Sequence, residues 1–270
     1  MNFEDMRIPT EAFESEQEAL WQEEEKEWLD SYNAWGETPL ARTELLLGAE
    51  NMEKLKRAKV ILVGVGGVGS VCGETLCRSG IGKLHIIDDD RVSISNLNRQ
   101  LIATTDVVGM PKTLAMGERL VIVSDTALTA AQERLTAENA ENILPPDADY
   151  IVDAVDDVPA KVAIALWAQR HRVPVLSCMG TGNRLDPAKL HITDVFKTSG
   201  DPLARKLRSC LRKNGIETLA AVCSEEPPRT VPGQTVIGSF MPVTAAAGLI
   251  AAWKVMTDIM NKDNGKEEEE

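Results

Sequence analysis

The chain has 270 residues, 43% of them hydrophobic, which is enough to build one large core. Its net charge of −13 and isoelectric point near 4.8 argue against nucleic-acid binding through overall charge, so any RNA contact needs a local basic surface. The five cysteines are scattered and include no CxxC pair, which excludes a disulfide scaffold and predicts reduced thiols and no zinc site.

Residues 1–40 are predicted to be an acidic helical extension. Glutamates dominate residues 11–30, and Trp21, Trp28 and Trp35 recur every seven positions, so a helix here carries an aromatic stripe on an acidic body. That stripe packs on the chain's own domain or binds a partner. Neither an apolar N-terminal run nor a signal-like cleavage pattern is present, which favours a cytoplasmic location.

A glycine-rich loop follows the first predicted strand, residues 59–63, and precedes a predicted helix over residues 71–79. This order places a phosphate at a helix N-terminus. The glycines of the loop make the tight turn, let the backbone approach the ligand and allow close helix packing. They are Gly64, Gly66, Gly67 and Gly69. A second strand, residues 83–87, ends in three aspartates, and Asp88 is well placed for a ribose hydroxyl. These features alone fit an NAD-binding domain.

Two cations and a further acid favour a nucleoside triphosphate over NAD. Arg99 and Lys112 follow the second strand, where they would neutralise charge on a leaving pyrophosphate. Another buried strand, within residues 150–157, carries acids at its carboxyl end, so Asp156 would face the nucleotide and hold Mg²⁺. These three residues are therefore candidate catalytic groups for a reaction at the α-phosphate of ATP.

A basic amphipathic helix is predicted within residues 202–216, which contain five cations and no acid. Leu203, Leu207 and Leu211 form its apolar stripe. The basic face is either a solvated surface or an RNA-binding one, and its members are Arg205, Lys206, Arg208, Arg212 and Lys213.

The remaining C-terminal residues read as a core helix and a tail. Residues 236–259 are apolar, but Lys254 and Asp258 interrupt them, so a core helix is favoured over a membrane span and membrane association is the weaker alternative. Residues 262–270 are predicted to be a disordered acidic tail. We therefore predict a single α/β domain over residues 41–261.

The cysteines are expected to pack rather than react. Cys72 and Cys77 lie on the predicted first helix of the domain, and Cys178 follows a short strand, where a small buried side chain fits. The three histidines share no motif with a nucleophile or a carboxylate pair and are interpreted as structural.

In this order, the segments GVGGVG, IIDDD, SNLNRQ, VGMPK and DAVDDV resemble the adenylating domain shared by ubiquitin-activating enzymes and their ThiF-type bacterial relatives. The resemblance implies a Rossmann-like α/β fold, with a mostly parallel sheet and helices on both faces, plus the N-terminal helical extension and a C-terminal helix. It implies that the glycine loop, Asn96, Arg99 and Lys112 contact phosphates, and that Asp88 and Asp90 lie at the ribose and the metal side. Asp156 is then the metal-associated acid, and Arg42 resembles the arginine that reaches into the partner subunit's site.

The last third resembles one branch of this superfamily, the tRNA threonylcarbamoyladenosine dehydratases, through HITDVFKT, DPLARKLR and VCSEEP. This resemblance implies ATP-dependent cyclisation of threonylcarbamoyladenosine next to the anticodon, with Mg²⁺, a homodimer and the basic helix against tRNA. A monovalent cation and a cysteine desulfurase or sulfur-acceptor partner stay open. The alternative enzyme adenylates the C-terminal carboxylate of a small sulfur-carrier protein. A dehydrogenase and a non-catalytic nucleotide-binding module are more remote alternatives.

Overall fold

The computed structural model describes residues 38–229, 232–233 and 236–262. The chain divides into two compact units at Leu46 and Leu47. Helix α2 (Ala41–Leu47) belongs almost wholly to the first of these units, Met1–Leu46. The bounds 41–261 for the α/β domain stay a prediction. The predicted acidic helix within residues 11–30 and the predicted tail after residue 262 lie outside the described residues.

The α/β unit is built on one seven-stranded sheet with the strand order β3-β2-β1-β4-β5-β7-β6. Its strands are β1 (Lys59–Val63), β2 (Lys83–Ile87), β3 (Ala127–Ala131), β4 (Tyr150–Asp153), β5 (Val175–Cys178), β6 (Leu190–Asp194) and β7 (Ala220–Ser224). All neighbouring strands are parallel except β6, which pairs antiparallel with β7 at one edge. The mostly parallel sheet is thus confirmed.

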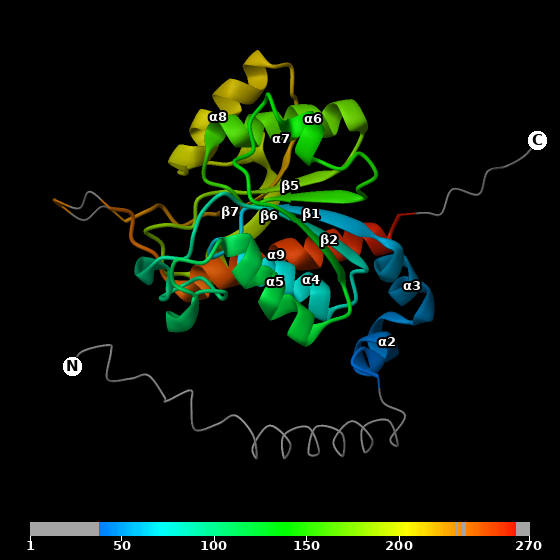
Figure 1. Cartoon of the computed structure of the whole chain (residues 1–270). Helices are drawn as coiled ribbons and strands as arrows, with labels where there is room; N and C mark the ends of the chain where they lie inside the picture. The colour runs from blue at the N-terminus through cyan, green and yellow to red at the C-terminus, as the bar shows by residue number, and fades with distance from the viewer. Residues whose placement is uncertain (1–37, 230–231, 234–235, 263–270) are drawn as a thin grey trace, which may run out of the picture. The chain divides into compact units, whose positions relative to one another are not determined.

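Helices cover both faces of this sheet (Figure 1). On one face lie α4 (Gly69–Arg78), α5 (Lys112–Val123) and α9 (Met241–Met260), with α3 (Ala49–Arg57) beside α9. On the other lie α6 (Ala140–Ile143), α7 (Val158–His171) and α8 (Pro202–Lys213). The alternation along β1 explains both layers, because Val60 and Leu62 enter the first core while Ile61 and Val63 enter the second.

Helix α9 packs closely on the glycine loop and on α4. A Cβ on Gly248 would stand 2.5 Å from the carbonyl oxygen of Val68, so only glycine permits this approach. Thr244, one turn earlier, lies against Gly67, where a Cβ would stand 3.2 Å from its side chain. Within the described part of the chain, α9 is the helix long and apolar enough to cross a membrane by length and composition. Its buried face here packs on α4 and the sheet, as the core-helix prediction requires.

Candidate active site

A pocket of about 580 Å³ opens where the carboxyl ends of β1, β2, β4 and β5 meet. Parallel strands bring the loops that follow them to one edge of a sheet, which is where open α/β sheets bind ligands. One wall is formed by the glycine loop and residues 88–112, and the opposite wall by residues 154–157 and 178–182. The structure therefore brings most of the predicted site residues together.

The glycine loop is held in one conformation by its own backbone. Gly64 has a φ of 91°, in the left-handed region that other residues avoid, and its N–H donates to the carbonyl oxygen of Ile87 at 2.8 Å. A Cβ on Gly69 would stand 1.8 Å from the carbonyl oxygen of Gly64. Both glycines are thus required for the turn that leads into α4. The loop lines the pocket at the N-terminus of this helix, where an anion is favoured.

Asp88 braces this loop from the end of β2. Its Oδ2 accepts the N–H of Val65 at 2.7 Å, and its Oδ1 accepts the N–H of Asp90 at 2.9 Å. Burial raises the pKa of the Asp88 carboxyl, and Lys112 and the two N–H donors oppose that rise. Asp88 lines the pocket as predicted and also shapes the loop, which the sequence did not indicate.

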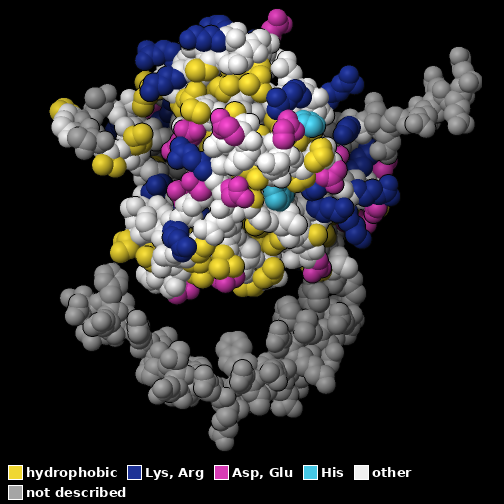
Figure 2. All heavy atoms as spheres, turned by 45° about the horizontal axis from the view of Figure 1, so that its top comes forward, with side chains coloured by type: hydrophobic (Ala, Val, Ile, Leu, Met, Phe, Trp, Pro, Cys, Tyr) yellow, Lys and Arg dark blue, Asp and Glu magenta, His cyan; other side chains and the backbone are white. Residues whose placement is uncertain are grey.

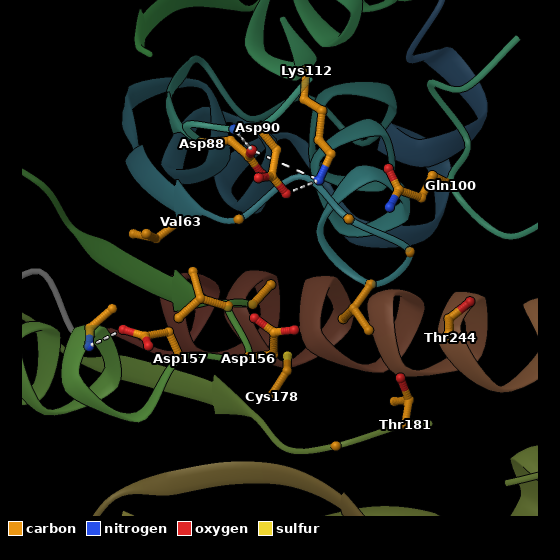
Figure 3. A pocket seen from close by; sticks show the side chains of 18 of the residues that line it. Val63, Asp88, Asp90, Gln100, Lys112, Asp156, Asp157, Cys178, Thr181 and Thr244 are labelled. Carbon is orange, nitrogen blue, oxygen red and sulfur yellow. Dashed lines mark hydrogen bonds and ion pairs between the residues drawn. The ribbon is translucent and has the colours of Figure 1, made fainter. Parts of the chain in front are cut away.

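Lys112 is nearly buried and is paired with the acids of the same wall. Its Nζ lies 2.6 Å from Asp90 Oδ2 and 3.9 Å from Asp88 Oδ1 (Figure 3). It is the first residue of α5, so its position is fixed by the start of that helix. Oxygens of Asp88, Asp89 and Asp90 lie within 4.8 Å of one another, close enough to hold a cation. This wall thus combines one cation with three acids, of which Lys112 engages two.

Asn96 and Arg99 belong to the turn that connects β2 to α5. Asn96 is buried, and its Oδ1 accepts the N–H of Ser93 at 3.0 Å to cap the 3₁₀ helix at residues 94–96. Arg99 Nη1 donates to the carbonyl oxygen of Ser95 at 2.7 Å and to Asn98 Oδ1 at 2.9 Å. Both residues line the pocket. Asn96 shapes the turn, and Arg99 supplies positive charge at the pocket wall.

Asp156 lies on the opposite wall, as an exposed residue of the loop after β4 (Figure 3). The loop is anchored by a different acid, Asp153, whose two oxygens lie 3.0 Å from the Nζ of the fully buried Lys161. Lys161 also donates to the carbonyl oxygen of Cys178 at 2.8 Å, and Ser177 donates to Asp153 at 2.5 Å. This network ties the loop after β4 to the loop after β5, so it fixes the wall that carries Asp156.

Several pocket residues were not singled out by sequence reasoning. Gln100 lines the pocket and follows Arg99 in the segment SNLNRQ. Its carboxamide is uncharged, so it was not selected as a phosphate-binding group. Arg134 lines the pocket and lies 3.3 Å from Asp157 Oδ1, joining the loop after β3 to the loop after β4. Thr181 and Thr244 come from the loop after β5 and from α9. No local pattern marks Arg134, Thr181 or Thr244, because only the folded arrangement of the strands and of α9 brings them to the pocket.

The basic helix exists as α8, with Leu207 and Leu211 buried and Leu203 lining the pocket. Figure 2 shows Lys and Arg side chains gathered at the upper left, on the side where Figure 1 places α8. Arg208 differs from the predicted outward face, because its Nη1 donates to the carbonyl oxygen of Thr198 at 3.0 Å and is committed to the protein. The remaining cations form no ion pair with any described residue; they are Arg205, Lys206, Arg212 and Lys213.

The start of α8 is fixed next to the pocket by a buried ion pair. Arg184 Nη2 lies 2.9 Å from Asp201 Oδ2, and both side chains are 1% exposed. Asp201 also caps α8 by accepting the N–H of Ala204 at 2.9 Å. Its Oδ2 lies 3.4 Å from where a Cβ would stand on Gly180, a pocket residue. The basic helix therefore begins at the pocket wall.

Cys178 and Arg42 complete the predicted set. Burial raises the pKa of the Cys178 thiol to about 12, which keeps it protonated and unreactive at neutral pH. Cys72 and Cys77 are buried on α4, as expected for packing residues. Arg42 is an exposed residue of α2 in the N-terminal unit.

The chain resembles known proteins over most of its length. A model of the ThiF family matches residues 40–269. The tRNA threonylcarbamoyladenosine dehydratase of Bacillus subtilis (strain 168) is 37% identical over 190 residues, which are 70% of this chain and 75% of that protein. The crystal structure of Escherichia coli tRNA N6-threonylcarbamoyladenosine dehydratase in complex with ATP superposes with a TM-score of 0.78 at 32% identity, covering 82% of this chain and 93% of that one. A sulfur carrier protein adenylyltransferase of Thermus thermophilus is 41% identical over 119 residues, which are 44% of each protein.

Proposed function

Because this chain belongs to the ThiF family, we propose that it is an ATP-dependent tRNA threonylcarbamoyladenosine dehydratase. One observation carries the proposal: a glycine loop, Arg99, Lys112 and Asp156 line a single pocket in a chain that resembles the ATP-bound E. coli dehydratase over most of both lengths. The matches to dehydratases extend over more of this chain than the match to the sulfur carrier protein adenylyltransferase. The function therefore follows from the site and the extended similarity together.

The proposed reaction has two steps. An oxygen of the threonyl carboxylate attacks the α-phosphate of ATP, and the bond to pyrophosphate breaks. A nitrogen or oxygen of the carbamoyl group then attacks the acyl carbon, the bond to AMP breaks, and the nucleophile's proton is lost. The loop N–H groups, Arg99 and Lys112 stabilise charge on the phosphates as pyrophosphate leaves. Lys112 would exchange its ion pair with Asp90 for a phosphate oxygen.

Mg²⁺ fits the acidic groups of both walls. Asp156 and Asp90 offer carboxylate oxygens on opposite sides of the pocket, and carboxylates are the ligands this ion prefers. When bound, the ion would neutralise phosphate charge during transfer. We propose Asp156 as the principal ligand. A monovalent cation remains a further candidate, and none of the steps above depends on it.

We propose that tRNA is bound along α8, by Arg205, Lys206, Arg212 and Lys213. Four exposed cations on a helix that starts at the pocket wall would track a phosphate backbone toward the site. Substituting Arg205 and Lys206 by Glu should weaken binding of the modified tRNA and flatten its salt dependence while leaving ATP binding intact. A matched reversal on α3, Lys56→Glu with Arg57→Glu, should change neither. Unaltered affinity in the α8 variant would make this face a solvated surface.

The direct test of the function measures adenylation and its acceptor. With tRNA carrying threonylcarbamoyladenosine, the protein should catalyse ATP–pyrophosphate exchange and form the cyclic nucleoside, read by mass spectrometry. ATP with Mg²⁺ should raise the melting temperature and NAD should not. Asp156→Asn should fold normally and form no AMP. Exchange that requires a sulfur-carrier peptide instead of tRNA would establish the alternative enzyme, and stabilisation by NAD equal to that by ATP would refute adenylation.

We further propose a cytoplasmic homodimer in which Arg42 serves the partner's site. Arg42→Ala and Asp156→Asn should each be inactive alone. If the arginine acts in trans, a mixed dimer carries both defects in one site and leaves the other intact, so random exchange should restore roughly a quarter of normal activity. No recovery on mixing would confine Arg42 to its own chain or remove it from catalysis. A sulfur-acceptor partner is the remaining proposal, to be sought by co-purification.

A further inference from the structure

One part of the pocket wall carries no charge. None of the described lining residues contributed by positions 178–244 is an acid or a cation; they come from the loop after β5, the start of α8, the segment before α9 and α9 itself. We call this the uncharged part of the pocket. The acids that line the pocket come from residues 88–157 instead. Figure 3 shows Thr181 and Thr244, two members of the uncharged part, on the opposite side of the view from Asp157.

ATP accounts for the rest of the pocket but not for its uncharged part. A Rossmann-like sheet holds the ribose at an acid after its second strand and the phosphates at the glycine loop. Here that acid is Asp88, after β2, and the pocket residues after β3 lie beyond it. The nucleoside therefore extends from the glycine loop toward β3. The uncharged part begins after β5, on the other side of β4, where a second substrate can approach the α-phosphate.

An apolar side chain stands at the rim of the uncharged part. Ile237 lines the pocket and is nevertheless 74% exposed. It lies over the loop after β5, because a Cβ on Gly182 would stand 2.3 Å from Ile237 Cγ2. Glycine at position 182 thus leaves the room that Ile237 occupies. An exposed isoleucine in this place offers apolar surface to a ligand rather than to the protein core.

The backbone on either side of Ile237 is anchored to both walls. The N–H of Gly238 donates to Asn183 Oδ1 at 2.6 Å, and the N–H of Asn183 donates to the carbonyl oxygen of Gly238 at 2.8 Å. On the other wall, Asn98 Nδ2 donates to the carbonyl oxygen of Ser239 at 3.2 Å. Ile237 is therefore held at the rim before any ligand binds, which lowers the entropic cost of a contact there.

The chemistry of the uncharged part suits a flat, uncharged group. Leu203, from the first turn of α8, adds a second aliphatic side chain to this part of the wall. Phosphates gain nothing from such a surface, whereas an unstacked base in a single-stranded RNA loop is bound by side chains that pack on its face. Because Leu203 belongs to the helix that we assign to tRNA, an RNA held along α8 would reach the pocket at this point.

We propose that the uncharged part of the pocket is the acceptor subsite, in which Ile237 and Leu203 pack on the unstacked adenine base of the modified nucleotide. The threonylcarbamoyl arm of the same nucleotide then points toward Asp156 and the glycine loop, where the α-phosphate is expected. This inference rests on the proposed function and deepens it by naming the residues that recognise the nucleotide. The subsite holds the base, and no bond forms or breaks there.

The test is Ile237→Ala, which removes the apolar surface from an exposed position and should leave the melting temperature unchanged. We expect the KM for the modified tRNA to rise about tenfold and kcat to stay within about twofold, as for a contact made equally in the ground and transition states. Stabilisation by ATP should be retained. Because an apolar contact releases no counterions, the salt dependence of tRNA binding should keep its slope, unlike that of the α8 charge reversal.

A second variant and a matched control sharpen the result. Gly182→Ala should displace Ile237 and raise the KM in the same direction. In the double variant with Ile237→Ala the new methyl group has room, so its KM should not exceed that of Ile237→Ala alone. Ile122→Ala, at an 83% exposed position on α5 outside the described pocket lining, should change none of these readouts.

The other outcomes are informative. Loss of stabilisation by ATP in Ile237→Ala would assign the uncharged part to the adenine of ATP and overturn the inference. An unchanged KM would remove Ile237 from substrate binding, and a flattened salt slope would attribute the loss to phosphate contacts instead of the base. Absence of tRNA-dependent pyrophosphate exchange in the unsubstituted protein would refute the proposed function, which is a separate result.

Discussion

The buried pair of Lys161 and Asp153 should dominate the stability of the pocket wall. Lys161 is 0% exposed and Asp153 is 1% exposed, and both carboxylate oxygens lie 3.0 Å from the ammonium group. Lys161→Met preserves most of the side-chain volume but leaves the Asp153 carboxylate uncompensated. Removing one partner of a buried pair costs about 3–5 kcal/mol. In a unit of this size that corresponds to a fall in melting temperature of roughly 6–20 °C.

The assay is thermal unfolding of single and double variants, followed by circular dichroism. Adding Asp153→Asn to Lys161→Met should recover part of the loss, because the second change removes the unpaired charge. As a control, Arg57→Met breaks an ion pair whose members are 76% and 50% exposed, so it should cost about 1 kcal/mol or less. A small effect of Lys161→Met, or a double variant less stable than either single one, would refute the reasoning. It would show that the pair does not hold the two pocket loops.

Three further predictions test single features. Burial acts to raise the pKa of Glu74, but two neighbouring arginines outweigh burial and hold this pKa below its usual value. The Glu74 carboxylate therefore stabilises the fold at pH values above its unfolded-state pKa. This contribution is lost as the pH falls through its folded-state pKa. Glu74→Gln should therefore cost about 1–3 kcal/mol at pH 7, and the difference in melting temperature should shrink toward pH 3; a constant difference would contradict this. Gly69→Ala should abolish stabilisation by ATP because a Cβ would meet the Gly64 carbonyl, whereas Gly117→Ala on α5, with no atom within 4 Å, should be neutral or stabilising by up to about 1 kcal/mol. The high pKa of Cys178 predicts slow alkylation by iodoacetamide at pH 8 in the folded protein and rapid alkylation after denaturation, as seen by peptide mass spectrometry; rapid labelling of the native thiol would reopen a covalent step.

The strands nearest the pocket could be predicted because their sequences carry a strong local signal. Residues 59–63 and 83–87 are mostly aliphatic after an initial lysine and are followed by glycine and aspartate, and they match β1 and β2 residue for residue. β4 ends at Asp153, before the acids of the next loop, because Asp153 turns toward Lys161. β3 has the sequence ALTAA and mostly exposed side chains, so neither hydrophobicity nor β-branching marks it.

The candidate site was predictable where charge and glycine mark it, and not where distant segments converge. Lys112 and Asp156 were found by their chemistry and sequence order, and both line the pocket. Thr244 is neutral and lies far from the nucleotide motifs in the chain, so only the packing of α9 on the glycine loop brings it to the pocket. Arg208 was placed outward by helical periodicity, which does not register that Thr198 accepts its hydrogen bond.

The packing of α9 on the glycine loop also orders events during synthesis. The residues that carry the nucleotide motifs, 64–157, are synthesised before β7 and α9. Until α9 has been synthesised, Thr244 does not contact Gly67 and Gly248 does not pack against the carbonyl oxygen of Val68. The glycine loop then lacks its packing partner on this side. We therefore expect ATP binding to stabilise only a chain that has been translated through α9. A fragment that ends before α9 would carry the nucleotide motifs of residues 64–157 but would lack Thr244, which lines the pocket, so we expect it to bind ATP poorly.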